Sequence, residues 1–138
     1  MTLVPEDEGF VRAFEAGTLA PEAFHHRDHV RLAWLYLREH APPLALARFS
    51  DGLRRYATLQ GKPDRYHETI TWAYLLLIHE RMARGAEATW DRFAAANPDL
   101  LRWKPSVLDG YYRPETLASP LARRVFLLPD REARAQGV

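Results

Sequence analysis

The stretch RYHETITWAYLLLIHERMAR, residues 65–84, decides the fold, because it contains the longest apolar run of the chain. That run extends from Ile70 to Ile78 and is interrupted only by Thr71. It is too short to cross a membrane, which takes about 20 apolar residues, and it suits a helix buried in a globular protein. Gly85 follows directly and is a common helix stop. We therefore predict a central helix over residues 65–84.

Five further helical blocks surround this stretch. A second apolar helix is predicted over residues 25–40, ending before Pro42 and Pro43. Apolar residues at three–four spacing and local stop signals predict the other helices, at residues 6–16, 44–60, 89–97 and 114–126. No segment alternates with a period of two, so we predict an all-α, single-domain helical bundle of about five to six helices over residues 1–138. Helices 25–40 and 65–84 are its central pair, and residues 1–5 and 130–138 are expected to be frayed.

Composition excludes several classes of function. The 138 residues carry a formal net charge of +1, which indicates neither a nucleic-acid-binding surface nor an electrostatic membrane anchor. The chain contains no cysteine, which excludes disulfides, thiolate metal sites and a cysteine nucleophile. The first residues lack a positive start and a long apolar run, so the predicted location is cytoplasmic. Oligomeric state is left open.

Four polar residues fall on the inward side of the two central helices. With about 100° of rotation per residue, His26 and His29 lie roughly 30° from the inward direction of helix 25–40. His67 and Glu68 lie about 50° from the inward direction of helix 65–84, one on each side, while Thr69 falls in its outer sector. An up–down–up arrangement with short connections makes the two helices parallel and brings these four side chains together.

Three imidazoles and a carboxylate are a suitable ligand set for a divalent transition metal. The sequence therefore predicts a metal centre in which His26, His29 and His67 are ligands. Glu68 is either a fourth ligand or the catalytic base acting on a metal-bound water. Zinc is the first expectation and non-haem iron the second. The corresponding function is a small metal-dependent enzyme acting on a small molecule.

Two other functions fit the same residues. The histidines and Glu68 can form a buried hydrogen-bonded network that lines a pocket for an organic ligand, in a module without catalytic activity. The chain can also be a bundle that pairs with another protein. The arginines are scattered over outer helix faces, which indicates solvated surface more than a phosphate-binding track. No phosphate-binding glycine loop, GxSxG elbow or HExxH motif is present.

Two motifs resemble a family of short, all-helical bacterial proteins of no established activity. The first is F-x-H-x-x-H, which here runs from Phe24 to His29, and the second is Y-H-E-T-x-T, from Tyr66 to Thr71. The similarity extends from about residue 24 to residue 129. It implies that the histidine site is a shared feature and names no reaction. DinB-like metal-binding four-helix bundles are similar only at the level of the fold, since their histidines occur in a different order.

Overall fold

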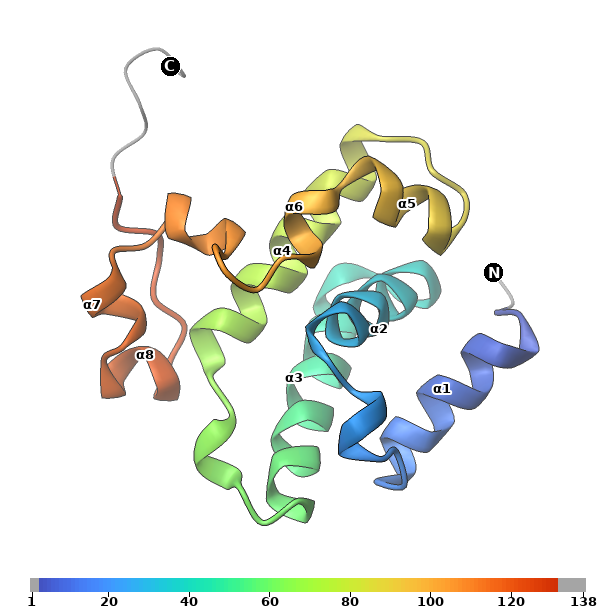
Figure 1. The fold of residues 1–138 in the computed structure, drawn as a ribbon, viewed down its shortest axis with the longest axis horizontal. Helices are drawn as coiled ribbons and strands as arrows, with labels where there is room; N and C mark the ends of the chain where they lie inside the picture. The colour runs from blue at the N-terminus through green and yellow to red at the C-terminus, as the bar shows by residue number, and fades with distance from the viewer. Residues whose placement is uncertain (1–2, 132–138) are drawn as a thin grey trace.

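The structure, a computed structural model, describes residues 3–131, and every regular element in that range is a helix (Figure 1). The α-helices are α1 (Pro5–Ala16), α2 (His26–Glu39), α3 (Pro42–Leu59), α4 (Glu68–Arg84), α5 (Trp90–Ala96), α6 (Pro98–Leu101), α7 (Pro114–Leu117) and α8 (Pro120–Arg124). Three short 3₁₀ helices connect them: η1 (Pro21–Ala23), η2 (Pro63–Arg65) and η3 (Val107–Gly110). The predicted all-α class is confirmed, and the predicted count of five to six helices is too low.

Proline accounts for the extra helices. It is the first residue of seven of the eleven helical elements in the described range. Proline suits the first helical position because its fixed φ fits a helix and its missing N–H has no partner there in any case. Inside a helix the same ring removes a hydrogen bond and clashes with the preceding turn. Pro120 therefore divides the block predicted at 114–126 into α7 and α8, and Pro98 opens the short α6.

The predicted central pair, α2 and α4, forms the middle of the molecule together with α3. Each of these three helices packs against the other two. Their contact surface is made of fully buried side chains, among them Leu32, Ala33, Leu35, Ala45, Leu75 and Ile78. No helix in the described part of the chain has both the length and the apolar character needed to cross a membrane.

The two central helices cross, whereas the sequence analysis expected them to run parallel. Figure 1 shows α4 lying across the view while α2 recedes from the viewer. The first turn of α2 consequently lies beside the middle of α4: the rings of His26 and Tyr74 are 5.0 Å apart. Tyr74 is nearly two turns beyond the start of α4. Steep crossings are at least as common as the shallow bundle angle, and helix periodicity alone does not select between them.

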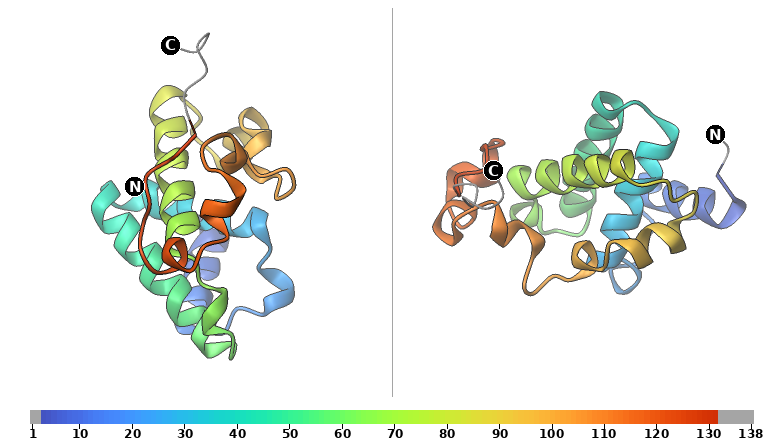
Figure 2. Two further views of the ribbon diagram at one scale, coloured as in Figure 1. Left: turned by 90° about the vertical axis from the view of Figure 1, so that its left-hand side faces the viewer. Right: turned by 90° about the horizontal axis from the view of Figure 1, so that it is seen from above.

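The C-terminal segment covers a face of α4 that was predicted to be exposed. Thr69 is fully buried there, and its hydroxyl donates to the carbonyl of Val125 at 2.8 Å and accepts from the amide of Leu127 at 3.1 Å. α8 packs along the same helix (Figure 2). The assignment of Thr69 to a solvated face is therefore wrong, because the covering residues lie more than fifty positions further along the chain.

The predicted frayed ends are described only in part. Residues 1–2 and 132–138 lie outside the described range. Within that range, Pro5 begins α1, and the amides of Asp130 and Arg131 both donate to the carbonyl of Tyr111 at 3.1 Å. Residues 130 and 131 thus contact Tyr111, and the fraying of residues 1–5 and 130–138 stays a prediction.

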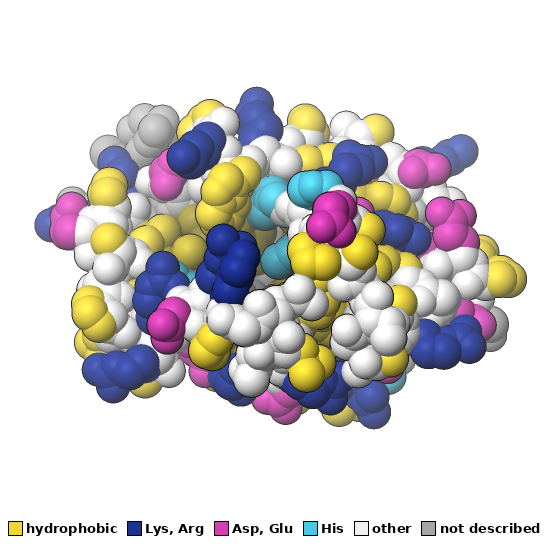
Figure 3. All heavy atoms as spheres, turned by 60° about the horizontal axis from the view of Figure 1, so that its bottom comes forward, with side chains coloured by type: hydrophobic (Ala, Val, Ile, Leu, Met, Phe, Trp, Pro, Cys, Tyr) yellow, Lys and Arg dark blue, Asp and Glu magenta, His cyan; other side chains and the backbone are white. Residues whose placement is uncertain are grey.

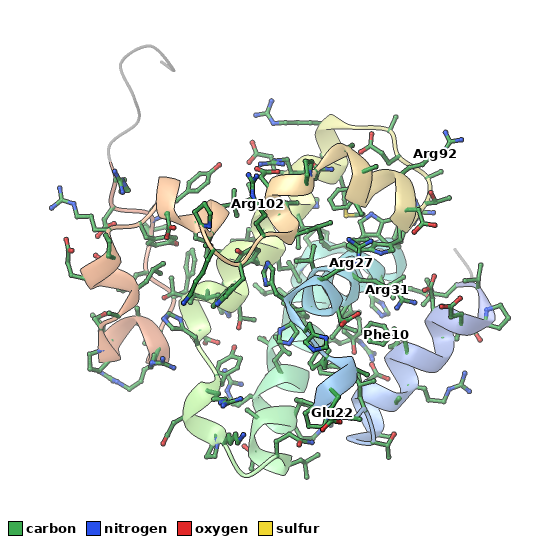
Figure 4. All side chains as sticks on the ribbon, in the orientation of Figure 1. Phe10, Glu22, Arg27, Arg31, Arg92 and Arg102 are labelled. Atoms are coloured by element: carbon green, nitrogen blue, oxygen red, sulfur yellow. The ribbon has the colours of Figure 1, made fainter. Side chains whose placement is uncertain are left out.

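α1 is attached to the side of α2 by charge and by aromatic packing. Arg31 of α2 forms an ion pair with Asp7 of α1, and its guanidinium lies 4.5 Å from the centre of the Phe10 ring (Figure 4). Further along α1, Phe14 is buried against Phe24 and Tyr56, at ring distances of 5.5 and 5.9 Å. This aromatic group joins α1 to α3.

Gly52 allows that close approach, and its replacement is the first test of the packing. A Cβ atom added at Gly52 meets Phe14 Cε2 at 2.5 Å and Cζ at 2.8 Å, and the Phe14 ring is fully buried. We expect Gly52→Ala to lower the free energy of unfolding by about 2 kcal/mol, measured by urea denaturation. Gly9→Ala is the control, because its Cβ meets nothing within 4 Å and should stabilise α1 by about 0.5 kcal/mol. Equal effects of the two changes would contradict the packing described.

Candidate functional site

A pocket of about 540 Å³ lies between α2, α3 and α4. The loop after α6 and the end of α8 also contribute to its lining. Six aromatic residues line it: Phe24, Phe49, Tyr56, Tyr66, Tyr74 and Trp103. Figure 3 shows the hollow, with histidine side chains and a cationic side chain at its border. The pocket therefore combines an apolar wall with a small set of polar groups.

Three of the four predicted site residues line this pocket, namely His26, His29 and His67. Glu68 is not among the lining residues. Neither His40 nor His79, which the sequence analysis excluded from the site, lines it either. Helix periodicity thus placed the histidines on the correct side of their helices, although the crossing of α2 and α4 changes what each ring contacts.

His67 has both of its ring nitrogens engaged. It is the N-cap of α4, where Nδ1 accepts a hydrogen bond from the amide of Ile70 at 3.1 Å. Nε2 lies 2.8 Å from the carbonyl oxygen of Leu117. An amide only donates and a carbonyl only accepts, so the ring is neutral with its proton on Nε2. Burial lowers the pKa of His67, as does the charge of Arg123, against the opposing effect of the Leu117 bond.

Glu68 is held away from the pocket by two partners. Its Oε1 accepts from Nη2 of Arg54 at 3.1 Å and from the phenol of Tyr66. Burial raises the pKa of Tyr66, and the bond to Glu68 raises it further, so the phenol keeps its proton and donates. Glu68 therefore orients Tyr66, which does line the pocket, and does not itself face the space in which a reaction or a metal-bound water would lie.

His26 has one ring nitrogen without a hydrogen-bond partner among residues 3–131. Its Nε2 lies 2.9 Å from the carbonyl oxygen of Leu100 and must donate, so Nδ1 carries the free lone pair of the neutral ring. The ring packs between Tyr74 and Trp103, at centroid distances of 5.0 and 5.1 Å. Burial lowers the pKa of His26, which favours this neutral form.

Of the three histidines, His29 forms the fewest hydrogen bonds with the described residues. Its ring stacks on Phe24 at 4.0 Å, and no hydrogen bond joins its nitrogens to another residue of the described range. Burial lowers its pKa from 6.5 to about 4, assisted by the neighbouring His26 and opposed by Asp28. At neutral pH, His29 therefore offers the pocket one N–H donor and one nitrogen acceptor.

The predicted metal centre is not assembled by these contacts. A ligating nitrogen needs a free lone pair, and His67 has none, while Glu68 is bound to Arg54 and Tyr66. Within residues 3–131, no group of three or more His, Asp or Glu side chains is placed to hold a metal ion. The four residues therefore do not fit a shared metal ion in this arrangement, and metal binding by the chain stays a prediction.

Sequence reasoning missed the cations and the tryptophan of the pocket. The pocket is also lined by three cationic residues: Lys62 just before η2, Arg65 at the end of η2, and Arg123 of α8. The half-exposed Trp103 lines it as well. The arginines were interpreted as solvated surface. The local spacing of these residues does not indicate that position 123 lies near positions 62 and 65. The one sequence signal for a cationic pocket wall was that Lys62 and Arg65 come shortly before His67.

Comparison with known proteins adds no relationship. No family model matches the chain, and neither a curated protein nor a solved structure matches it. The resemblance carried by the two histidine motifs therefore stays a prediction, and function has to be argued from the pocket itself.

Proposed function

We propose that this protein binds a small organic molecule in the pocket between α2, α3 and α4. The observation that supports this most is the pocket itself: about 540 Å³ of space with an aromatic lining and three histidines at its wall. Pockets for small ligands generally have volumes of about 300–1,000 Å³, a mostly apolar lining and a few polar groups. A helical core of this size has no packing reason to leave such a space, because protein interiors are normally close-packed.

The polar groups of the wall define how a ligand is oriented. His26 offers a nitrogen acceptor, because its N–H is already used on Leu100. His29 offers both a donor and an acceptor, since its ring has no other hydrogen-bond partner in the described range. His67 presents no free polar atom and serves instead to hold the start of α4 against Leu117. Of the three histidines, the two on α2 are therefore the ones that can bind a polar group of the ligand.

Tryptophan fluorescence tests the proposal directly. Of the four tryptophans of the chain, only Trp103 lines this pocket. We expect binding of a small aromatic compound such as 1-naphthamide or 1-naphthoate to change the tryptophan emission, and to raise the melting temperature in parallel. The emission change should disappear in Trp103→Phe and persist in Trp90→Phe.

Two results would count against the proposal. A panel of small aromatic and aliphatic compounds that leaves both the emission and the melting temperature unchanged would show that the pocket takes no ligand of this kind. An emission change that depends on Trp90 and not on Trp103 would place binding elsewhere, because Trp90 lies between α5 and α2 and not in this pocket.

A metal ion held by α2 alone is the second candidate. His26 and His29 are one turn apart on the same helix, both line the pocket, and each has a nitrogen free of protein hydrogen bonds in the described range. Elemental analysis of protein purified without a histidine tag and soaked in zinc or iron(II) tests it. Uptake near one equivalent that is lost in His29→Ala and retained in His79→Ala would support this candidate. Uptake below about a tenth of an equivalent would eliminate it.

A further inference from the structure

We propose that the ligand of the pocket is an organic anion: an apolar, ring-containing body with a carboxylate or similar acidic group held by Lys62, Arg65 and Arg123. The inference rests on the proposed function, since it names the class of molecule that the pocket takes. It starts from the charges of the lining. Three cationic side chains line the pocket, and no aspartate or glutamate does.

The three cations come from two segments of the lining, η2 with the residue before it, and α8. Lys62 directly precedes η2 and Arg65 ends it, while Arg123 comes from α8. Nη1 of Arg123 donates to the carbonyl oxygen of Asp64 at 2.8 Å. Asp64 is a residue of η2 and lies between Lys62 and Arg65 in the sequence, so the guanidinium of Arg123 contacts η2. α8, which carries Arg123, packs against α4. The positive end of the α4 dipole points to the same region.

These cations are not neutralised by the protein. Most ion pairs of the described residues involve other arginines, among them Arg31 with Asp7, Arg54 with Glu68 and Arg81 with Asp99. Lys62, Arg65 and Arg123 form no ion pair with any described residue, although Asp64 is their neighbour in sequence. A region that gathers three unpaired positive charges beside an apolar cavity attracts a negatively charged group of a bound molecule.

The rest of the lining accounts for the body of the ligand. Phe24 and its stacked partner His29 provide flat surface on α2 and the residues before it, and Phe49 adds an apolar ring from α3. Trp103 adds a half-exposed indole beside His26, at 5.1 Å. Aromatic faces of this kind favour a planar ring, which stacks on them. The pocket thus has an apolar part for a ring and a cationic part for an acidic group.

A matched pair of compounds tests the inference. 1-Naphthoate and 1-naphthamide have nearly the same shape and differ in charge. Binding of each is followed by Trp103 fluorescence and by calorimetry. We expect wild-type protein to bind the anion about tenfold or more tightly than the amide at low salt, and this preference should decrease as sodium chloride is added, because exposed charges are screened.

Substitutions then show which residues cause the preference for naphthoate over naphthamide. Arg123→Gln should weaken naphthoate binding about threefold, and the triple change Lys62→Gln, Arg65→Gln, Arg123→Gln should bring the two compounds to equal affinity. Naphthamide affinity should change little in either. Arg124→Gln is the matched control, because Arg124 is the next residue of α8, is also exposed and does not line the pocket.

The outcomes separate this inference from the proposed function. Equal binding of the two compounds by wild-type protein would overturn the anion inference and leave the pocket a small-molecule site. An effect of Arg124→Gln as large as that of Arg123→Gln would also overturn it, since the preference would then reflect overall charge. If neither compound nor any other of the panel binds, the proposed function fails and the inference with it.

Discussion

Lowering the pH from 7 to 4 is expected to reduce the free energy of unfolding by about 3 kcal/mol through His29 alone. In the folded protein the pKa of His29 is lowered from 6.5 to about 4, because burial disfavours the charged ring. The unfolded chain therefore takes up a proton as the pH falls through 6.5, while the folded protein does not until about pH 4. The stability is present above pH 6.5 and is lost between these two values. His26 and His67, whose pKa values are also lowered, act in the same direction.

Urea denaturation at a series of pH values measures this dependence. His29→Gln should reduce the loss of stability between pH 7 and 4 by about 3 kcal/mol relative to wild-type protein. His79→Gln is the control, because His79 is an exposed residue of α4 that does not line the pocket. A His29→Gln profile that parallels the wild-type profile would show that His29 is not held neutral in the fold.

Thr69→Val is expected to lower the free energy of unfolding by about 3 kcal/mol. The substitution keeps the shape of a fully buried side chain and removes its hydroxyl. The carbonyl of Val125 and the amide of Leu127 then lose the partner that ties them to α4. Each backbone group deprived of its hydrogen bond costs about 1–3 kcal/mol, less where water can reach it.

The same substitution should also loosen the C-terminal segment before the whole protein unfolds. Amide hydrogen exchange of residues 125–127 should become faster in Thr69→Val, whereas exchange within α2 should change only by the global loss of stability. Thr69→Ser is the control, since it retains the hydroxyl and its two bonds. A valine variant that is as stable as wild-type protein, or that loses less stability than the serine variant, would show that the two hydrogen bonds of Thr69 contribute little.

The helices themselves could be predicted from the sequence because their signals are local. The predicted ranges 25–40 and 65–84 correspond to α2 (His26–Glu39) and α4 (Glu68–Arg84). The spacing of apolar residues and the proline or glycine beside each segment are sufficient to predict these helix ranges. The crossing of α2 over α4 depends on how side-chain ridges fit together, and the burial of Thr69 depends on residues more than fifty positions away. Neither is encoded in a short window.

The candidate site was predictable in its position and not in its chemistry. Helix geometry is sufficient to turn His26, His29 and His67 toward the interior. The role of each ring depends on a distant partner, such as the carbonyl of Leu100 for His26 and that of Leu117 for His67. With those contacts in place, His67 has no free ring nitrogen, and the three histidines form part of a pocket wall without Glu68.

The long separations in this wall have a consequence for synthesis of the chain. His67 is joined to a residue 50 positions later, and Thr69 to residues 56 and 58 positions later. Closing such loops costs entropy that only the completed contacts offset. A chain synthesised from its N-terminus lacks Arg123 and the α8 side of the pocket until residues more than fifty positions beyond His67 have been added. A ligand that is held by Arg123 can therefore stabilise the chain only after α8 has been added.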